Sequence, residues 1–220
     1  MTKTLSETLF EKYCDSCGIR WRPVAVGPTR TPDYDIFLRR FKVVTEVKEI
    51  TQNQIERQAE EDLKKYKYTA VSTIPGDRVR GKISDAVPQI KARSKGRFPG
   101  LLVLFGKGFS AGHIDSYQIR VAMYGFETIV IAVPNDMSVS PYATGKKFGA
   151  KRKVTPVHNT SLSAIASLTF TAKDKLELKI FHNNYAAVPL DHRLFAHYGV
   201  SQYKLGEAEP GDIAQWIETS

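Results

Sequence analysis

Three charged residues, Asp33, Glu46 and Lys48, have the types and the spacing that metal-assisted hydrolysis of a phosphate ester requires. They lie in the segment 31–49, which reads TPDYDIFLRRFKVVTEVKE. Because side chains alternate between the two faces of a strand, Glu46 and Lys48 project to one side and Val47 to the other. Two charged groups on one face of an apolar strand indicate a chemical role. The alternative is a surface hairpin that carries an ordinary Asp, Glu and Lys.

The two strands of this segment are expected to form a hairpin that turns at Arg39-Arg40. In a hairpin with this centre, Asp33 lies opposite Glu46. Arg-Arg lacks the Asn-Gly chemistry of a two-residue turn, and a slip of one residue would send the two acids to opposite faces. Asp35 lies on the same strand face as Asp33 and is a second candidate for the same role. We favour Asp33.

Opposed carboxylates less than about 6 Å apart repel each other unless a cation lies between them or one of them holds a proton. Oxygen ligands in small number suit Mg²⁺ or Mn²⁺, which keep water in their other positions, whereas zinc prefers His and Cys. Lys48 would lie beside the metal, where an ammonium group steadies an attacking hydroxide or the charge that builds on a phosphoryl group. The segment therefore predicts a magnesium or manganese site between Asp33 and Glu46.

This arrangement resembles a known nuclease motif. Pro32-Asp33, followed by Glu46-Val47-Lys48, is similar to the PD-(D/E)XK motif of the restriction-endonuclease-like nuclease superfamily. The resemblance covers residues 5–105. It implies that Asp33 and Glu46 bind the metal with help from the Val47 carbonyl, and that Lys48 positions or activates the water.

The resemblance also implies roles for residues outside the motif. An acidic residue in the helix before the motif strands belongs to the superfamily pattern, and Glu11 would fill this place as an accessory catalytic residue and metal ligand. Gln89 and Lys91, in the helix after the motif, look similar to polar positions that some members add to the site.

The sequence periodicity predicts an α/β (α+β) fold with a mixed central sheet flanked by helices. The expected helices cover residues 4–17, 55–66, 77–92 and 161–168; strands are expected within 19–26, 34–38, 41–47, 101–105, 128–133 and 176–182. Pro88 should kink or interrupt the third helix. Residues 134–159 show little periodicity and are expected to form a long loop. The chain is expected to be one domain, with a restriction-endonuclease-like core over residues 5–133 and a C-terminal elaboration over 134–220.

Basic residues are concentrated in two stretches, 76–97 and 141–153. The chain carries 32 Lys and Arg against 23 Asp and Glu, and its formal net charge of +9 favours a polyanionic partner. The alternative is that both stretches are solvated faces without a partner. The residues expected to contact nucleic acid are Arg80, Lys82, Gln89, Lys91, Lys146, Lys147, Lys151, Arg152 and Lys153.

Together these features predict a Mg²⁺-dependent nuclease, in the form of an endonuclease, that hydrolyses DNA phosphodiester bonds. A non-catalytic nucleic-acid-binding or regulatory subunit with a nuclease-like fold is the alternative function. RNA as the substrate and a homodimeric assembly stay open. The longest apolar runs are too short for a membrane span, and the N-terminus turns charged where a signal peptide is apolar, so a cytoplasmic protein is expected. Cys14 and Cys17 share the apolar stripe of the first helix, which favours a core role over a metal site.

Overall fold

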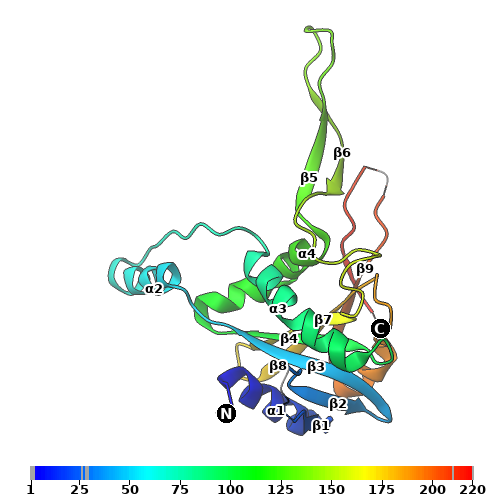
Figure 1. Cartoon of the computed structure of the whole chain (residues 1–220). Helices are drawn as coiled ribbons and strands as arrows, with labels where there is room; N and C mark the ends of the chain where they lie inside the picture. Colours follow the sequence, from blue (N-terminus) through cyan, green and yellow to red (C-terminus); the bar gives the residue numbers. More distant parts are fainter. Residues whose placement is uncertain (1–2, 26, 28–29, 210, 220) are drawn as a thin grey trace.

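The computed structural model describes residues 3–25, 27, 30–209 and 211–219. Among these residues, eight strands form one mixed sheet in the order β1-β2-β3-β4-β7-β8-β9-β10, and two strands pair separately (Figure 1). The strands of the large sheet are β1 (Arg20–Pro23), β2 (Tyr34–Leu38), β3 (Phe41–Ile50), β4 (Gly100–Gly106), β7 (Ala164–Phe170), β8 (Leu176–His182), β9 (Ser201–Leu205) and β10 (Trp216–Glu218). The separate pair is β5 (Glu127–Ala132) and β6 (Tyr142–Phe148).

Helices cover both faces of the large sheet, as the sequence predicted for a mixed α/β fold (Figure 1). They are α1 (Leu5–Cys17), α2 (Gln54–Tyr66), α3 (Asp77–Ser94) and α4 (Ser116–Tyr124), with short 3-10 helices η1 (Gly108–Ile114), η2 (His192–Leu194) and η3 (Ala196–Tyr198). One hydrophobic core joins Phe10 of α1 to Val47 of β3, and the other joins Ile83 of α3 to Ile50 of β3. Because neighbouring residues of a strand point to opposite faces, Glu46 and Lys48 project to the face that α3 covers.

The hairpin that carries the motif has the predicted centre. Strands β2 and β3 pair antiparallel from Tyr34 opposite Thr45 to Leu38 opposite Phe41, and Arg39-Arg40 forms the turn. Arg39 adopts a positive φ of 56°, a conformation that suits a tight turn but that side chains other than Asn, Asp and Gly rarely adopt. The register therefore comes from burial of the apolar face, which a slip of one residue would expose.

The predicted first helix is confirmed. Thr4 caps its start and exchanges hydrogen bonds with Glu7 as a capping box, and Gly18 ends it in the left-handed conformation. Cys14 is fully buried and packs in the core of this face, as predicted, while Cys17 is partly buried against it. Burial raises the pKa of the Cys14 thiol, so it stays protonated and serves as an apolar side chain.

Helix α3 continues through Pro88 from Asp77 to Ser94, so the predicted interruption is wrong. The predicted short helix over 161–168 is also wrong, because residues 164–170 form the buried strand β7 between β4 and β8. A short apolar run such as Ala164-Ile165-Ala166 fits a strand that is buried on both faces as well as it fits a helix, and periodicity does not separate the two.

The largest difference from the sequence-based expectation lies in residues 127–148. The loop expected over 134–159 contains strand β6, which pairs with β5 in a hairpin that projects from the body of the protein (Figure 1). The run 128–133 resembles a buried strand in sequence, yet Ile129 and Ile131 are each 59% exposed. An apolar run shows that a strand forms but not what covers it. Within the described part of the chain, no helix combines the length and the apolar character of a membrane span.

Candidate active site

Asp33 and Glu46 meet where β2 begins, as the hairpin register predicted. The backbone amide of Asp33 donates a hydrogen bond to Oε2 of Glu46 over 3.1 Å, and the backbone amide of Val47 donates to Oδ2 of Asp33 over 2.8 Å. Each carboxylate is thus fixed to the strand that carries the other acid. One oxygen of each carboxylate is used in this way, which leaves Oδ1 of Asp33 and Oε1 of Glu46 to face other groups.

Lys48 completes this group from the same face of β3. Its ammonium nitrogen forms an ion pair with Oε1 of Glu46, while the side chain of Lys48 keeps 26% of its surface exposed. Glu46 itself is fully buried, and its Oε1 accepts no well-oriented hydrogen bond. A buried carboxylate oxygen with a single cationic neighbour is electrostatically undersatisfied, which favours a further cation or a proton there.

Burial affects the protonation of both acids. It raises the pKa of Glu46 to about 7, and the negative charge of Asp33 adds to the shift while Lys48 opposes it. Burial also raises the pKa of Asp33, against the hydrogen bond from Val47 and the charge of Lys48. The pair therefore binds a proton more readily than isolated carboxyl groups do, as expected for two acids that share one site without a metal.

The donor set fits a hard divalent cation. Asp33 and Glu46 offer carboxylate oxygens, and the Val47 carbonyl lies between Glu46 and Lys48 in the chain. Among the described residues, no group of three His, Cys, Asp or Glu side chains is close enough together to hold a metal. Two carboxylates plus backbone oxygen and water suit Mg²⁺ or Mn²⁺ better than zinc, which prefers a set of His and Cys ligands.

Glu11 lies in α1 and its carboxylate is engaged elsewhere. The hydroxyl of Tyr34 donates to its Oε1 over 2.8 Å, and Lys3 pairs with its Oε2 over 2.8 Å. Glu7, one turn earlier, is the acid of α1 whose negative charge raises the pKa of Asp33. Sequence reasoning missed Glu7. Residues four apart share one side of a helix, so the spacing alone does not separate Glu7 from Glu11.

Asp35, the alternative to Asp33, has a different environment. It is fully buried, and Arg93 from α3 donates to both of its oxygens, over 2.9 Å from Nε and 2.5 Å from Nη2. Arg22 and Lys42 add ion pairs at 3.3 and 3.8 Å. Burial alone would raise the pKa of Asp35, but these cations hold it below its usual value. Asp35 therefore fastens α3 to the hairpin and, unlike Asp33, has both of its carboxylate oxygens paired with cations.

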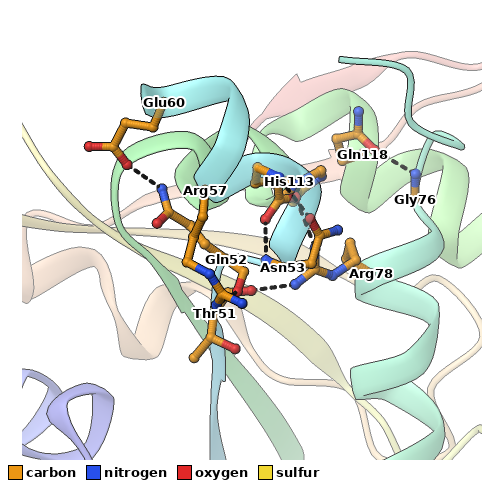
Figure 2. A network of polar contacts seen from close by, with 10 residues as sticks. Thr51, Gln52, Asn53, Arg57, Glu60, Gly76, Arg78, His113 and Gln118 are labelled. Carbon is orange, nitrogen blue, oxygen red and sulfur yellow. Dashed lines mark hydrogen bonds and ion pairs between the residues drawn. The ribbon is translucent and has the colours of Figure 1, made fainter. Parts of the chain in front are cut away.

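A second polar network fixes the other end of α3. Glu56 is 2% exposed and accepts hydrogen bonds from Arg78 over 2.9 Å, from His113 over 2.5 Å and from the Asn53 backbone over 2.9 Å. Arg78 also donates to the Thr51 carbonyl just beyond β3, and Figure 2 shows Arg78, Thr51, Asn53 and His113 close together. Helix α3 is thus attached near both ends of β3, by Arg93 at one end and Arg78 at the other.

These two attachments define the side of α3 that lies along β3. Lys82 and Gln89 fall on the same side of the helix as Arg78 and Arg93, at spacings of four or seven residues. Gln89 is 7% exposed and its amide donates to the Asp85 carbonyl within the helix. The structure thus places Lys82 and Gln89 on the side of α3 that runs along the strand of Glu46 and Lys48.

The other residues expected to contact nucleic acid fall into two groups. Five of them line two adjoining pockets beside α3, namely Arg80, Lys91, Lys151, Arg152 and Lys153. Lys146 and Lys147 lie in strand β6 rather than in the expected mobile loop, and Lys146 pairs with Asp212 over 3.1 Å. Lys91 is on the pocket side of α3, away from Gln89.

The chain was compared with protein-family models, with curated proteins and with solved structures, and none of the three comparisons gave a significant match.

Proposed function

We propose that this protein is a Mg²⁺- or Mn²⁺-dependent nuclease that hydrolyses DNA phosphodiester bonds. The observation that carries the proposal is the pairing of Asp33 with Glu46, with the ammonium group of Lys48 against Glu46. A fully buried Glu46 that faces a partly buried Asp33 is costly in a protein that only binds, whereas a phosphodiester hydrolase needs two such acids to hold a cation.

The order of elements supports a restriction-endonuclease-like core. Helix α1 precedes the motif hairpin of β2 and β3, helix α3 follows it, and β4 pairs parallel to β3 from Val44 opposite Gly100 to Ile50 opposite Gly106. The helix before the motif and the helix and strands after it are the parts that this superfamily shares. We infer that the elements after β4 are an elaboration of this core.

In this mechanism, Asp33, Glu46 and the Val47 carbonyl would hold the cation. The cation would supply an acidic water and neutralise the charge that develops on the phosphoryl oxygens. Lys48 is held by Glu46 at the edge of the pair, where its exposed ammonium group can donate a hydrogen bond to the attacking oxygen. Its positive charge would also stabilise the transition state more than the ground state where it lies near the nonbridging phosphoryl oxygens, because negative charge develops on them.

A cleavage assay with matched variants tests this proposal. Wild-type protein, Glu46→Gln and Glu49→Gln are incubated with supercoiled plasmid, linear duplex and RNA in Mg²⁺, Mn²⁺, Ca²⁺ or EDTA. We expect the wild type and Glu49→Gln to cut DNA with Mg²⁺ or Mn²⁺, and Glu46→Gln to cut at least about 10²-fold more slowly. Glu49 is the control because it is three residues away on the same strand and points to the opposite face.

Four outcomes contradict the proposal in whole or in part. Cleavage in EDTA, or equal cleavage by Glu46→Gln and the wild type, would exclude the metal mechanism. DNA binding without cleavage in any metal would favour the non-catalytic subunit. Preferential cleavage of RNA would keep the site and replace the substrate.

A further inference from the structure

A basic cleft lies beside α3, on a different side of the helix from the acid pair. It consists of two adjoining pockets of about 410 and 610 Å³ that share Ser84 and Lys153. We call it the α3 cleft, and its defining residues are Arg80, Ser84, Lys91, Lys151, Arg152 and Lys153. On α3, Arg80, Ser84 and Lys91 recur at spacings of four and seven, whereas the side along β3 carries Arg78, Gln89 and Arg93.

The wall of the α3 cleft opposite the helix is fastened to the body of the protein. Backbone hydrogen bonds join Lys153 to the Ala122 carbonyl over 3.1 Å and Val154 to the Met123 carbonyl over 2.9 Å, at the end of α4. The ammonium group of Lys153 reaches across and donates to the Ser84 hydroxyl over 2.7 Å. Lys153 and the backbone of this wall are therefore positioned before any ligand arrives, which lowers the entropic cost of binding.

Arg80 is the buried member of the α3 cleft. Its side chain is 5% exposed, its Nη2 donates to the Pro75 carbonyl over 2.7 Å, and its Nη1 has no hydrogen-bond partner. Its guanidinium group lies over the ring of Phe126, with 5.0 Å between the group and the ring centre. The Nη1 atom is covered, so the guanidinium group acts on a ligand through its positive charge, which an anion in the α3 cleft would compensate.

The positive charge of the α3 cleft is nearly uncompensated. Among the described residues, the contact of Arg80 with Asp77 at 3.5 Å is the one ion pair that any cation of the cleft forms. Lys91, Lys151 and Arg152 are exposed and unpaired. Five cations around one carboxylate create a positive potential that attracts an anion.

The length of the α3 cleft favours a polymer over a single phosphate. Arg80 and Lys91 are eleven residues apart on α3, which corresponds to ~16 Å along the helix axis. Successive phosphates of one duplex strand rise by about 3.4 Å along the DNA axis, so a cleft of this length faces several of them. Arg80 and Lys151 both lie over the ring of Phe126, at 5.0 and 5.7 Å from its centre, so this ring already has two cationic partners in place of a base. This favours contact with the backbone.

We propose that the α3 cleft binds backbone phosphates of a nucleic acid away from the bond that is cut. The identity of the ligand as a nucleic acid rests on the proposed function. The binding of an anion rests only on the charge and the geometry of the cleft. With Lys82 and Gln89 along β3 and these cations on the other side, α3 would contact the nucleic acid on two sides. The cleft then contributes affinity and fixes the position of the strand, and it takes no part in the hydrolysis itself.

The test measures duplex binding in EDTA by fluorescence anisotropy over a range of salt concentrations. The cleft variant carries Lys91→Gln, Lys151→Asn and Arg152→Gln, with Asn at position 151 because this residue has a φ of 63°. The control variant carries Lys12→Gln, Lys173→Gln and Lys175→Gln, which removes the same charge from exposed positions outside the cleft. Melting temperatures confirm that both variants fold.

We expect the cleft variant to bind about 10-fold or more weakly than the control variant. Its slope of log K against log salt should be smaller by about 0.9 for each phosphate that the protein no longer neutralises. Equal affinities and slopes for the two variants would overturn the assignment. If inorganic phosphate protects the wild type against heat but not the cleft variant, and DNA affinities are equal, the ligand is a small phosphorylated molecule and the nucleic-acid assignment is also overturned.

The experiments distinguish a failure of the proposed nuclease function from a failure of the proposed α3 cleft. Binding in EDTA requires no turnover, so a protein that never cuts DNA but loses affinity in the cleft variant would refute the nuclease and keep the cleft. A protein that cuts DNA with Mg²⁺ but binds equally well in both variants would keep the nuclease and refute the cleft.

Discussion

Asp33 donates its backbone N–H to the carboxylate of Glu46 across the β2–β3 hairpin, over 3.1 Å. This hydrogen bond and the one from Val47 to Asp33 hold two acids together although their charges repel. The backbone that forms the sheet thus supplies the donors that hold both carboxylates. We expect the β2–β3 hairpin to persist when the charge of one of these side chains is removed. Variants of the charged side chains therefore change the chemistry of the site while the hydrogen bonds of the sheet stay in place.

Metal binding requires both acids. We expect Mn²⁺ to bind to the wild type in isothermal titration calorimetry, and binding to disappear in the double variant Asp33→Ala/Glu46→Ala, because each acid contributes a ligand. Ca²⁺ should bind without supporting turnover, since its larger and more flexible coordination shell positions the attacking water poorly. An unchanged isotherm in the double variant would place the metal elsewhere.

Lys48 should matter for rate rather than for binding. Lys48→Ala is expected to retain the metal affinity and to lower the cleavage rate by on the order of 10²-fold, because its charge acts mainly in the transition state. Lys48→Arg should not restore the rate, since a forked guanidinium group does not replace a compact ammonium group. Single-turnover cleavage measures this directly. Wild-type rates in Lys48→Ala would remove Lys48 from the mechanism.

The pKa of Glu46 predicts a pH-dependent stability. Burial raises this pKa to about 7, so the folded protein without metal favours the protonated acid. The contribution of Glu46 to the free energy of unfolding is then largest below the unfolded-state pKa near 4.5 and falls as the pH rises toward 7. A shift from 4.5 to about 7 corresponds to about 3 kcal/mol.

Thermal unfolding in EDTA at several pH values checks this expectation. At about pH 8, Glu46→Gln should unfold at a higher temperature than the wild type, and near pH 4.5 the difference should shrink, because Gln carries no charge at either pH. Mg²⁺ should stabilise the wild type at high pH and leave Glu46→Gln nearly unchanged. A wild type that is the more stable of the two at high pH in EDTA would show that Lys48 outweighs burial.

Asp35 should matter for stability rather than for the metal. Asp35→Ala removes the partner of Arg93 and leaves its guanidinium group half-buried without a carboxylate, which is expected to cost about 3–5 kcal/mol of unfolding free energy. Chemical denaturation measures this loss. At a temperature where Asp35→Ala is folded, Mn²⁺ should still bind to it. Failure of a folded Asp35→Ala protein to bind Mn²⁺ would make Asp35 a ligand.

The sequence predicts that Asp33 and Glu46 lie opposite each other, but it does not predict which residues surround them. The alternation of side chains in residues 34–47 is a local property of strands. Together with a turn at Arg39-Arg40, it is enough to bring Asp33 opposite Glu46. The contact of Asp35 with Arg93 joins residues 58 positions apart, and the influence of Glu7 on Asp33 depends on how α1 lies on the sheet. Such relationships are set by tertiary packing, which no local pattern encodes.

The same limit explains the error in residues 127–148. The apolar residues Ile129 and Ile131 indicate a strand correctly, and the strand forms. Burial was inferred from composition, but burial depends on the neighbours of a strand, and the hairpin of β5 and β6 lies outside the large sheet.

This hairpin leaves the body of the protein and returns to it at almost one point. The amide of Gly149 donates to the Phe126 carbonyl over 2.7 Å, and the amide of Phe126 donates to the Ala150 carbonyl over 3.1 Å, so these two bonds close the base. The lower part of the hairpin has further contacts, because the amide of Lys146 donates to the Gly211 carbonyl over 2.7 Å and Phe148 packs against the core, so changes in length are best tolerated at its tip, in residues 133–141. The tip can therefore differ in length and sequence while Lys153 and Val154 keep their backbone hydrogen bonds to the end of α4.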